Sequence, residues 1–304
     1  MALTLDTRRR LPAALHSLLQ RELDHAVRRL DQAAGPTPDD LVTGVHEFRR
    51  SVKRLRAALQ LLDGAVTTGE RTAIDELLGG AARRLGALRD SHARTLAAQR
   101  VVRLVPRSMR ALAMDAWRSA GGAGVEASTR QGEAGVAGLL RRSRAEIEQA
   151  RARVKALDLS KVDAALLSRA VSDAWARARD RFRSRWDGRD EAWLHGNRKR
   201  AQRAANLLLL MASAAGPWAV RTERRLRKAT ALLGEARDAE LMVERMPEPE
   251  PGSPLRVPAQ RLRTLARRHR ATCLRAARAQ GVAAMREGRG PVRRRLRKAL
   301  DPAR

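Results

Sequence analysis

Tyrosine is absent from the 304-residue sequence, which contains only five Trp and two Phe. Proteins usually hold single-stranded nucleic acid by stacking its bases on aromatic rings, so this scarcity favours contacts with phosphate over contacts with bases. A single cysteine, Cys273, excludes an internal disulfide. No stretch approaches the roughly 20 apolar residues of a membrane span, and the first ten residues lack the apolar segment of a signal peptide. We therefore expect a soluble, cytoplasmic protein that does not contact a membrane.

Acidic residues are also few relative to basic ones. Lys and Arg number 63 against 33 Asp and Glu, which gives a formal net charge of +30. A hydrophobic content of 43% is too high for a disordered basic tail, so a folded protein with a polyanionic partner is expected. Only six of the basic residues are lysine, and the planar fork of arginine suits phosphate oxygens. A GC-rich genome produces the same excess of arginine, so position rather than number must identify a site.

The pattern of residues predicts an all-α protein. Strand patterns are missing, whereas Ala, Leu, Arg, Glu and Gln are good helix formers. Thr37 and Thr67 are predicted N-caps, Ser160 with Asp163 is expected to cap a further helix, and Gly216-Pro217 is a predicted break. The predicted helices cover residues 8–33, 38–62, 67–104, 136–156, 160–186, 190–214, 218–245 and 258–280, with a glycine-rich loop at 121–135, a proline-rich linker at 247–254 and a short helix in the basic tail 288–304.

Two short motifs occur twice at nearly the same spacing. Val45-His46-Glu47-Phe48-Arg49 corresponds to Leu194-His195-Gly196-Asn197-Arg198, 149 residues later. Leu85-Gly86-Ala87-Leu88-Arg89-Asp90 corresponds to Leu233-Gly234-Glu235-Ala236-Arg237-Asp238, 148 residues later. Two unrelated motifs at nearly one offset indicate an internal duplication. We predict two halves of four helices each, residues 1–157 and residues 158–304, the second including the basic C-terminal tail.

The predicted helix that carries His46 has an apolar side and a basic side. At about 100° per residue, Phe48, Val52 and Leu55 share one side of it. The opposite side and its flank contain no acidic residue and consist of His46, Arg49, Arg50, Lys53, Arg54 and Arg56. Like charges three or four residues apart repel, so a stripe of this kind costs stability and suggests an anionic ligand. A solvated surface is the alternative interpretation.

The second half repeats this stripe with losses. His195, Arg198, Lys199 and Arg203 take the corresponding positions, but Gln202 and Ala205 replace two of the basic residues. The second half is therefore expected to bind more weakly. The seventh predicted helix adds a basic side made of Arg224, Arg227 and Lys228, and the third adds Arg83. For the two matching histidines, anion contact, packing and metal binding all stay open.

Signatures of enzymes and metal sites fail one by one. His46-Glu47 begins like the zinc motif H-E-x-x-H, but Arg50 stands where the second histidine is required. There is no P-loop, no glycine-rich dinucleotide motif and no cluster of acidic residues typical of a Mg²⁺ site. His269 is interpreted as structural and Cys273 as a small core residue. We expect no catalytic residues, no metal and no cofactor.

Taken together, the motifs resemble the CHAD domain, the conserved histidine α-helical domain. The resemblance rests on Val45-His46-x-x-Arg49-x-x-x-Lys53-Arg54-x-Arg56, its weaker echo Leu194-His195-x-x-Arg198-Lys199, and the sequence Leu-Gly-x-x-Arg-Asp in both halves; it covers residues 8–282. It implies two four-helix bundles with pseudo-twofold symmetry that form one CHAD domain. It also implies inorganic polyphosphate as the partner and, for some members, association with polyphosphate granules.

The resemblance assigns polyphosphate binding to the matching basic residues, in a groove between the bundles. Many members are fused to a CYTH domain, whose signature is E-x-E-x-K, but here Glu248-Pro249-Glu250 is followed by Pro251-Gly252 and no β-rich segment exists. We therefore expect a stand-alone, non-catalytic binding protein. Non-specific, weak binding of nucleic acid is the alternative, because a charge of +30 attracts any polyanion. The sequence leaves the oligomeric state open.

Overall fold

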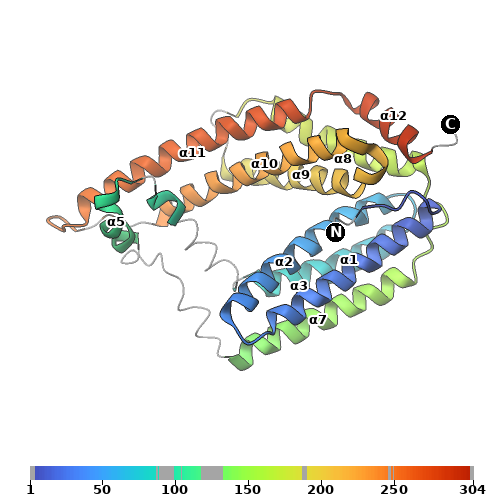
Figure 1. Ribbon diagram of the computed structural model, residues 1–304, viewed down its shortest axis with the longest axis horizontal. Helices are drawn as coiled ribbons and strands as arrows, with labels where there is room; N and C mark the ends of the chain where they lie inside the picture. Colours follow the sequence, from blue (N-terminus) through green and yellow to red (C-terminus); the bar gives the residue numbers. More distant parts are fainter. Residues whose placement is uncertain are drawn as a thin grey trace.

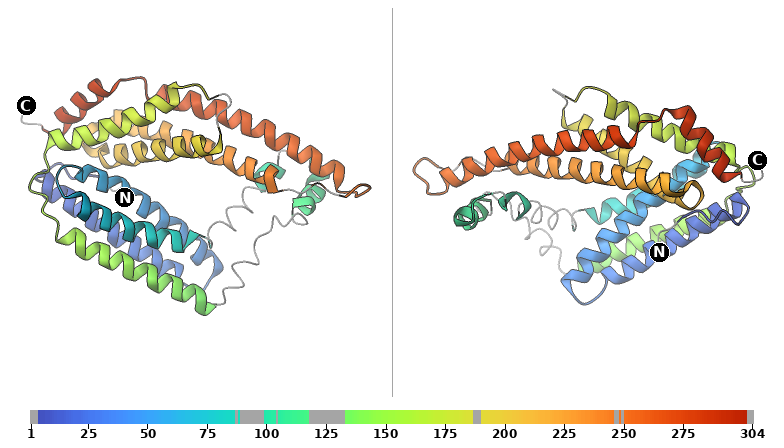
Figure 2. Two further views of the ribbon diagram at one scale, coloured as in Figure 1. Left: turned by 180° about the vertical axis from the view of Figure 1, so that it is seen from behind. Right: turned by 45° about the horizontal axis from the view of Figure 1, so that its top comes forward.

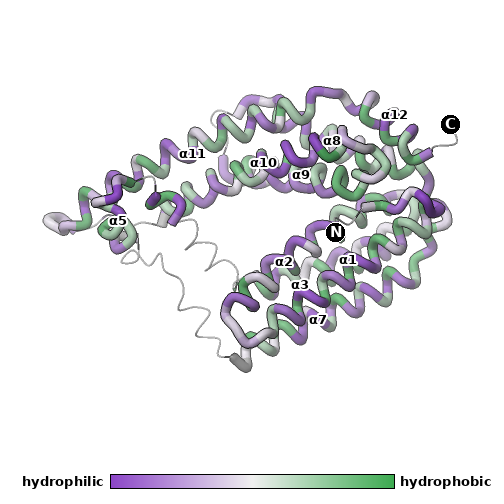
Figure 3. Tube along the Cα trace, viewed as in Figure 1, coloured by the Kyte–Doolittle hydropathy of each residue, from purple (hydrophilic) through white to green (hydrophobic). Residues whose placement is uncertain are grey.

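The computed structural model describes residues 4–301, except residues 87, 89–98, 104, 118–132, 187–189, 246–247 and 249. Within these residues the regular secondary structure is helical, with one isolated bridge between Asp63 and Val66 and no strand. The predicted all-α class is confirmed. Hydrophilic and hydrophobic residues alternate along the helices, as expected for amphipathic helices that share a core (Figure 3).

The first half of the chain supplies one group of packed helices, which we call the N-terminal group. Helix α2 packs against α1 and α3, and α7 packs against both α1 and α3 (Figure 1). The group consists of α1 (Leu11–Ala33), α2 (Pro38–Ala58) with the 3₁₀ turn η1 (Leu59–Leu62), α3 (Thr68–Arg84) and α7 (Glu133–Lys155).

The second half supplies the C-terminal group. Helix α10 packs along both α9 and α11, while α8 packs against α9 and is covered by the short α12 (Figure 1). The Trp175 indole donates to the Glu287 carbonyl oxygen at 3.1 Å, and Arg295 lies 4.7 Å from the ring centre of Trp218, so aromatic contacts fix α12 in place. The group consists of α8 (Ala164–Arg183), α9 (Glu191–Leu210), α10 (Ala212–Arg245), α11 (Arg256–Ala284) and α12 (Arg289–Leu300).

Most of the predicted helix boundaries follow from local sequence signals. Thr37 and Thr67 each cap a helix and each forms a full capping box, with Asp40 and Glu70 respectively. Gly216 has φ of 63° and ψ of −152°, so α10 is broken at the predicted Gly216-Pro217 position. The predicted short helix in the basic tail is α12.

Other boundaries differ from the prediction. Helix α3 ends at Arg84 because Leu85 adopts a turn. Residues 86, 88 and 99–102 are helical again, and residues 87 and 89–98 lie outside the described residues. Asp163 alone caps α8 by accepting from the Leu166 amide, so the predicted role of Ser160 is wrong. The predicted loop 121–135 lies mostly outside the described residues, and its last three residues begin α7. Helix α11 is longer than predicted because its apolar contacts continue to Ala284.

The two groups share one apolar core and meet along α2 and α9. The Asn206 side chain of α9 donates to the Lys53 carbonyl oxygen of α2 at 3.3 Å. At the C-terminal end of α9, the Leu210 carbonyl oxygen accepts a hydrogen bond from the Leu5 amide at 2.7 Å, which joins the N-terminal segment to the C-terminal group. The helices that carry the two repeated histidine motifs are therefore direct neighbours.

A segment between α3 and α7 packs on the opposite group of helices. It contains the 3₁₀ turn η2 (Arg107–Met109) and helix α5 (Arg110–Trp117), which lies beside the far end of the α10–α11 hairpin (Figures 1 and 2). Together they enclose a second, smaller core made of Val101, Val102, Val105, Ala113, Trp117, Ala239, Met242, Ala259, Leu262 and Ala266. Neither this helix nor its position was predicted from the sequence pattern.

Membrane-spanning character is missing from the helices of the described part of the chain. None of them combines the length and the apolar composition that crossing a bilayer requires.

Candidate anion-binding site

The basic residues predicted on α2 lie where that helix faces its neighbours. Phe48, Val52 and Leu55 are buried at 0–1% exposure, which confirms the apolar side of the helix. His46, Arg50 and Arg56 are exposed, whereas Arg49, Lys53 and Arg54 are half-buried. The helical period thus separates the basic side from the core as predicted.

The expectation that this basic side has no neutralising carboxylates is wrong. Arg56 donates to both carboxylate oxygens of Asp75 on α3, at 2.8 and 2.7 Å. Arg50 Nη1 lies 2.8 Å from Glu47 Oε1 on its own helix. Long arginine side chains reach carboxylates on the flank of their own helix and on adjacent helices. The residues of a single helix face do not reveal those carboxylates.

Arg54 forms the most buried of these ion pairs. Its Nε donates to Glu22 Oε1 of α1 at 2.6 Å, and its Nη2 donates to Ser51 Oγ at 3.1 Å. The Glu22 side chain is 1% exposed and that of Arg54 is 12% exposed. Removing one partner of such a pair leaves a buried charge without compensation and typically costs about 3–5 kcal/mol. Arg54 therefore holds α2 against α1 as well as adding positive charge.

The two arginines of the repeated histidine motifs lie over the two glycines of the other repeated motif. Arg49 Nη1 donates to the Ala82 carbonyl oxygen and lies 3.5 Å from where a Cβ on Gly86 would stand. Arg198 Nη2 lies 2.9 Å from the corresponding position on Gly234. The absence of a side chain at each glycine leaves room for a guanidinium group against the helix. This contact explains why the two motifs recur together.

Cations of the two groups lie close enough to influence one another. Burial first, and then the nearby cations Lys199, Arg198, Arg237 and Lys53, lowers the pKa of His195. Lys53 belongs to α2 and His195 to α9, so this repulsion acts across the contact between the two groups.

Two further arginines show the same repulsion. Burial, followed by Arg177 and Arg56, lowers the pKa of Arg203 on α9. Burial, followed by Arg50 and Arg54, lowers the pKa of Arg227 on α10. Each set joins α2 with a helix of the C-terminal group. Positive charge from α2, α9 and α10 therefore converges at the α2–α9 contact.

The two halves differ in how their matching arginines are neutralised. Arg54 and Arg203 correspond at the 149-residue offset, and so do Glu22 and Val171. Because valine replaces the glutamate, no carboxylate forms an ion pair with Arg203 among the described residues. Arg203 is an exposed residue, although neighbouring groups partly cover its guanidinium. The loss of basic residues at positions 202 and 205 is thus partly offset, since Arg203 is more available to an anion than Arg54.

The remaining predicted residues take more peripheral positions. Arg83 is exposed on α3. Its Nη1 lies 3.1 Å from where a Cβ on Gly79 would stand, and Arg56 Cζ lies 3.8 Å from the same point. Arg224 and Lys228 are exposed on α10, and their side chains form no hydrogen bond or ion pair with other described residues. The structure therefore brings Arg83 close to the α2 side, whereas Arg224 and Lys228 extend the basic surface along α10.

Sequence reasoning missed three arginines of this region. Arg177 on α8 and Arg200 on α9 both act on Arg203, and Arg237 acts on His195. Arg177 belongs to a predicted helix that was assigned no basic side, so the sequence pattern did not indicate it. Arg237 belongs to the second repeated motif and forms an ion pair with Glu191 at 3.0 Å.

A small pocket opens beside the second histidine motif, between α9, α10 and α11. Its polar lining combines one carboxylate with a histidine and three arginines, and its full lining is Glu191, Leu194, His195, Arg198, Leu233, Ala236, Arg237, Arg270 and Leu274. The excess of guanidinium groups suits an oxyanion rather than a cation.

This geometry and the repeated motifs agree with the comparison to known families. The sequence model of the CHAD domain matches residues 13–221, which is more than half of the chain. The chain therefore belongs to the CHAD domain family. The match extends from α1 into α10, and thus includes both histidine motifs.

A solved structure shares the fold. It is PptA from Streptomyces chartreusis, with a TM-score of 0.62 and 16% sequence identity. The similarity covers 91% of this chain and 99% of that one. A search of curated proteins found no match.

Proposed function

We propose that this protein binds inorganic polyphosphate, without catalysis, along the basic surface where α2 meets α9. The observation that carries the proposal is the convergence of cations from α2, α9 and α10; burial first, and then the neighbouring cations, lowers the pKa values of His195, Arg203 and Arg227. A polyanion stabilises such an arrangement by supplying negative charge beyond that of the carboxylates that pair with Arg50, Arg54, Arg56 and Arg227. Membership of the CHAD family supports the same partner.

The spread of the charges favours a chain of phosphates over a single small anion. The cations come from three helices of both groups, so one compact ligand reaches only part of them. A flexible polyphosphate follows the surface and takes charge-assisted hydrogen bonds from several guanidinium groups. Each contact releases counterions, so affinity falls steeply as salt rises.

In this proposal the two groups are bundles derived from an internal duplication, divided near residues 157 and 158, with pseudo-twofold symmetry and a basic groove between them. The spacing of the two motifs supports the duplication, and so does the equivalent position of Arg49 over Gly86 and Arg198 over Gly234. The predicted residues of α2, α9 and α10, together with Arg83, form the wall of that groove. As a further part of the proposal, the protein associates with polyphosphate granules in the cytoplasm.

Non-specific binding of nucleic acid is the competing proposal, because the charge of +30 attracts any polyanion. The aromatic side chains argue against base recognition. All seven are buried or half-buried, and Phe48 and Phe182 have 0% exposure. The described surface therefore carries no fully exposed aromatic residue of the kind on which bases stack.

A titration with long-chain polyphosphate and with duplex DNA, each across a salt series, tests the function. We expect polyphosphate binding to persist at salt concentrations that abolish DNA binding. Equal or tighter binding of DNA would favour the competing proposal. Incubation of the complex with Mg²⁺ tests the absence of catalysis, because release of phosphate above the protein-free rate would show a hydrolase.

A further inference from the structure

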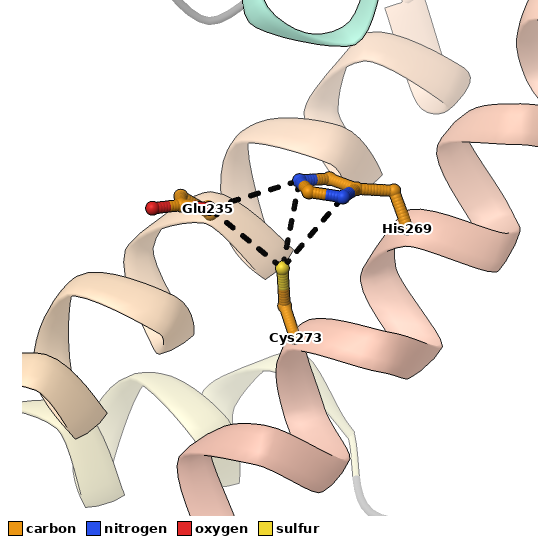
Figure 4. Close-up of side chains that lie close together, drawn as sticks. All are labelled: Glu235, His269 and Cys273. Carbon is orange, nitrogen blue, oxygen red and sulfur yellow. Dashed lines mark hydrogen bonds and ion pairs between the residues drawn. The ribbon is translucent and has the colours of Figure 1, made fainter. Parts of the chain in front are cut away.

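Helices α10 and α11 bring together three side chains that are potential metal ligands. Glu235 comes from α10, while His269 and Cys273 lie one turn apart on α11 (Figure 4). Their ligand atoms all lie within 4.8 Å of one another. From the sequence, His269 and Cys273 were interpreted as unrelated structural residues, because the sequence does not reveal that Glu235 faces them.

The three separations suit a bound transition metal. Cys273 Sγ lies 3.5 Å from His269 Nε2 and 3.8 Å from Glu235 Oε2, and these last two atoms are 3.8 Å apart. A point equidistant from three atoms with these separations lies about 2.1 Å from each of them, close to zinc–ligand distances of about 2.0–2.3 Å. An ion slightly out of their plane would leave a fourth, tetrahedral position for water.

Binding requires a small rearrangement of the histidine. Sγ lies 3.5 Å from Nε2 and 3.9 Å from Nδ1, so it stands beside the ring rather than along the lone pair of one nitrogen. The imidazole must turn to direct Nε2 at the shared point. Its side chain is 24% exposed, which leaves room for that rotation.

The three side chains lie between the protein interior and the solvent. Cys273 is 3% exposed and packs in the interior, while the Glu235 side chain is 33% exposed. Burial, and then the adjacent Glu235 carboxylate, raises the pKa of the Cys273 thiol to about 11. Metal binding must therefore displace a proton from sulfur at neutral pH.

We propose that Glu235, His269 and Cys273 form a Zn²⁺ site that joins α10 to α11. A thiolate, an imidazole and a carboxylate are the ligand types that zinc takes in proteins, and three protein ligands leave one position for water. The site is separate from the proposed polyphosphate surface and does not depend on it.

A metal at this position would stabilise the long α10–α11 hairpin. The far part of that hairpin forms the second core with the segment from Val101 to Trp117. The side of the hairpin that faces α9 contributes Ala236 and Leu274 to the pocket that contains His195. Zn²⁺ would therefore stabilise the unit that holds both features. Because it binds the folded protein, it raises the melting temperature by mass action.

Titration of the polyphosphate-free protein with Co²⁺, a spectroscopic substitute for zinc, tests the proposal. We expect thiolate-to-cobalt charge-transfer absorption and the visible bands of tetrahedral Co²⁺, both displaced by one equivalent of Zn²⁺. The apparent affinity is expected to rise with pH, because a thiol must lose its proton to bind the metal.

Variants separate this site from adventitious binding. Cys273→Ser should abolish the charge-transfer band, and Glu235→Gln should weaken Co²⁺ binding at least about tenfold, as loss of a ligand or its partner commonly does. His16→Gln, at a histidine of α1 outside the cluster, is the matched control and should change nothing. Circular dichroism confirms that each variant is helical, and the more exposed Glu235 provides a test even if Cys273→Ser unfolds.

Two results would overturn the proposal. One is the absence of a thiolate band at saturating Co²⁺ in the wild-type protein. The other is a band, or a Zn²⁺-dependent rise in melting temperature, that Glu235→Gln leaves unchanged. Polyphosphate affinity measured on the same variants stays at the wild-type value if the two sites are independent.

Discussion

The ion pair between Arg56 and Asp75 provides a direct test of competition between internal carboxylates and polyphosphate. Asp75 accepts two hydrogen bonds from Arg56, and it also counteracts the fall in the pKa of Arg203 that burial and neighbouring arginines cause. Asp75 therefore neutralises cations of both groups at the proposed site. We predict that Asp75→Asn makes the protein bind polyphosphate more tightly.

The expected size follows from the exposure of the pair. The Arg56 and Asp75 side chains are 44% and 38% exposed, and exposed ion pairs are typically worth about 0.2–1 kcal/mol. Loss of this pair should reduce the free energy of unfolding by no more than that amount. If polyphosphate replaces Asp75 as the partner of Arg56, the same free energy appears as a gain in affinity of about 1.5-fold to 5-fold. One more available cation steepens the salt dependence by about 0.7–0.9 in log–log slope.

The control is Asp31→Asn, which makes the same change in net charge elsewhere. Asp31 pairs with Arg144 between α1 and α7, and these side chains are 51% and 49% exposed. Titration calorimetry or fluorescence anisotropy across a salt series compares the two variants. Equal affinity in both variants would refute the reasoning, because net charge alone would then explain the change. Weaker binding by Asp75→Asn would also contradict it.

Three further predictions test other parts of the account. Burial and nearby cations lower the pKa of His195, so its protonation destabilises the free folded protein as pH falls below 6.5. Bound polyphosphate instead favours the protonated histidine. Polyphosphate affinity should therefore rise as pH falls, and it should rise less in His195→Gln. Gly234→Ala places a Cβ 2.9 Å from Arg198 Nη2, so polyphosphate affinity should drop while thermal stability stays equal or rises by up to about 1 kcal/mol. Gly281→Ala places a Cβ 2.1 Å from Phe182 Cδ1 in the core, and denaturant unfolding should show a loss of at least about 1–3 kcal/mol; no loss would contradict the packing of α8 on α11.

The helices were largely predictable because their signals are local. Thr37 and Thr67 begin helices through hydrogen bonds that span three residues, and Gly216 breaks one through its own backbone angles. The interruption of the third predicted helix at Leu85 was not predicted, because composition does not indicate a turn there. The sequence pattern also separated the apolar and basic sides of α2, since that separation depends only on the helical period.

Contacts between helices far apart in the chain were not predictable in the same way. The pairing of Arg54 with Glu22 and of Arg56 with Asp75 depends on how α1 and α3 lie against α2, which one helix cannot reveal. The packing of residues 101–117 on the α10–α11 hairpin depends on tertiary structure for the same reason. The offset of 149 residues is the stronger signal, because it connects His46 to His195 through the sequence alone, and the helices that carry them are in contact.

The most direct test of the central claim compares two triple variants that each remove two arginines and one lysine. One carries Arg50→Ala, Lys199→Ala and Arg203→Ala at the proposed site, and the other removes the exposed α12 residues Arg294, Arg297 and Lys298. Polyphosphate affinity and its salt slope are measured for both, with circular dichroism to confirm folding. We predict that the site variant loses at least about tenfold in affinity and about two units of slope, while the α12 variant changes little. Equal losses in the two variants would contradict a defined site and leave only the attraction of net charge.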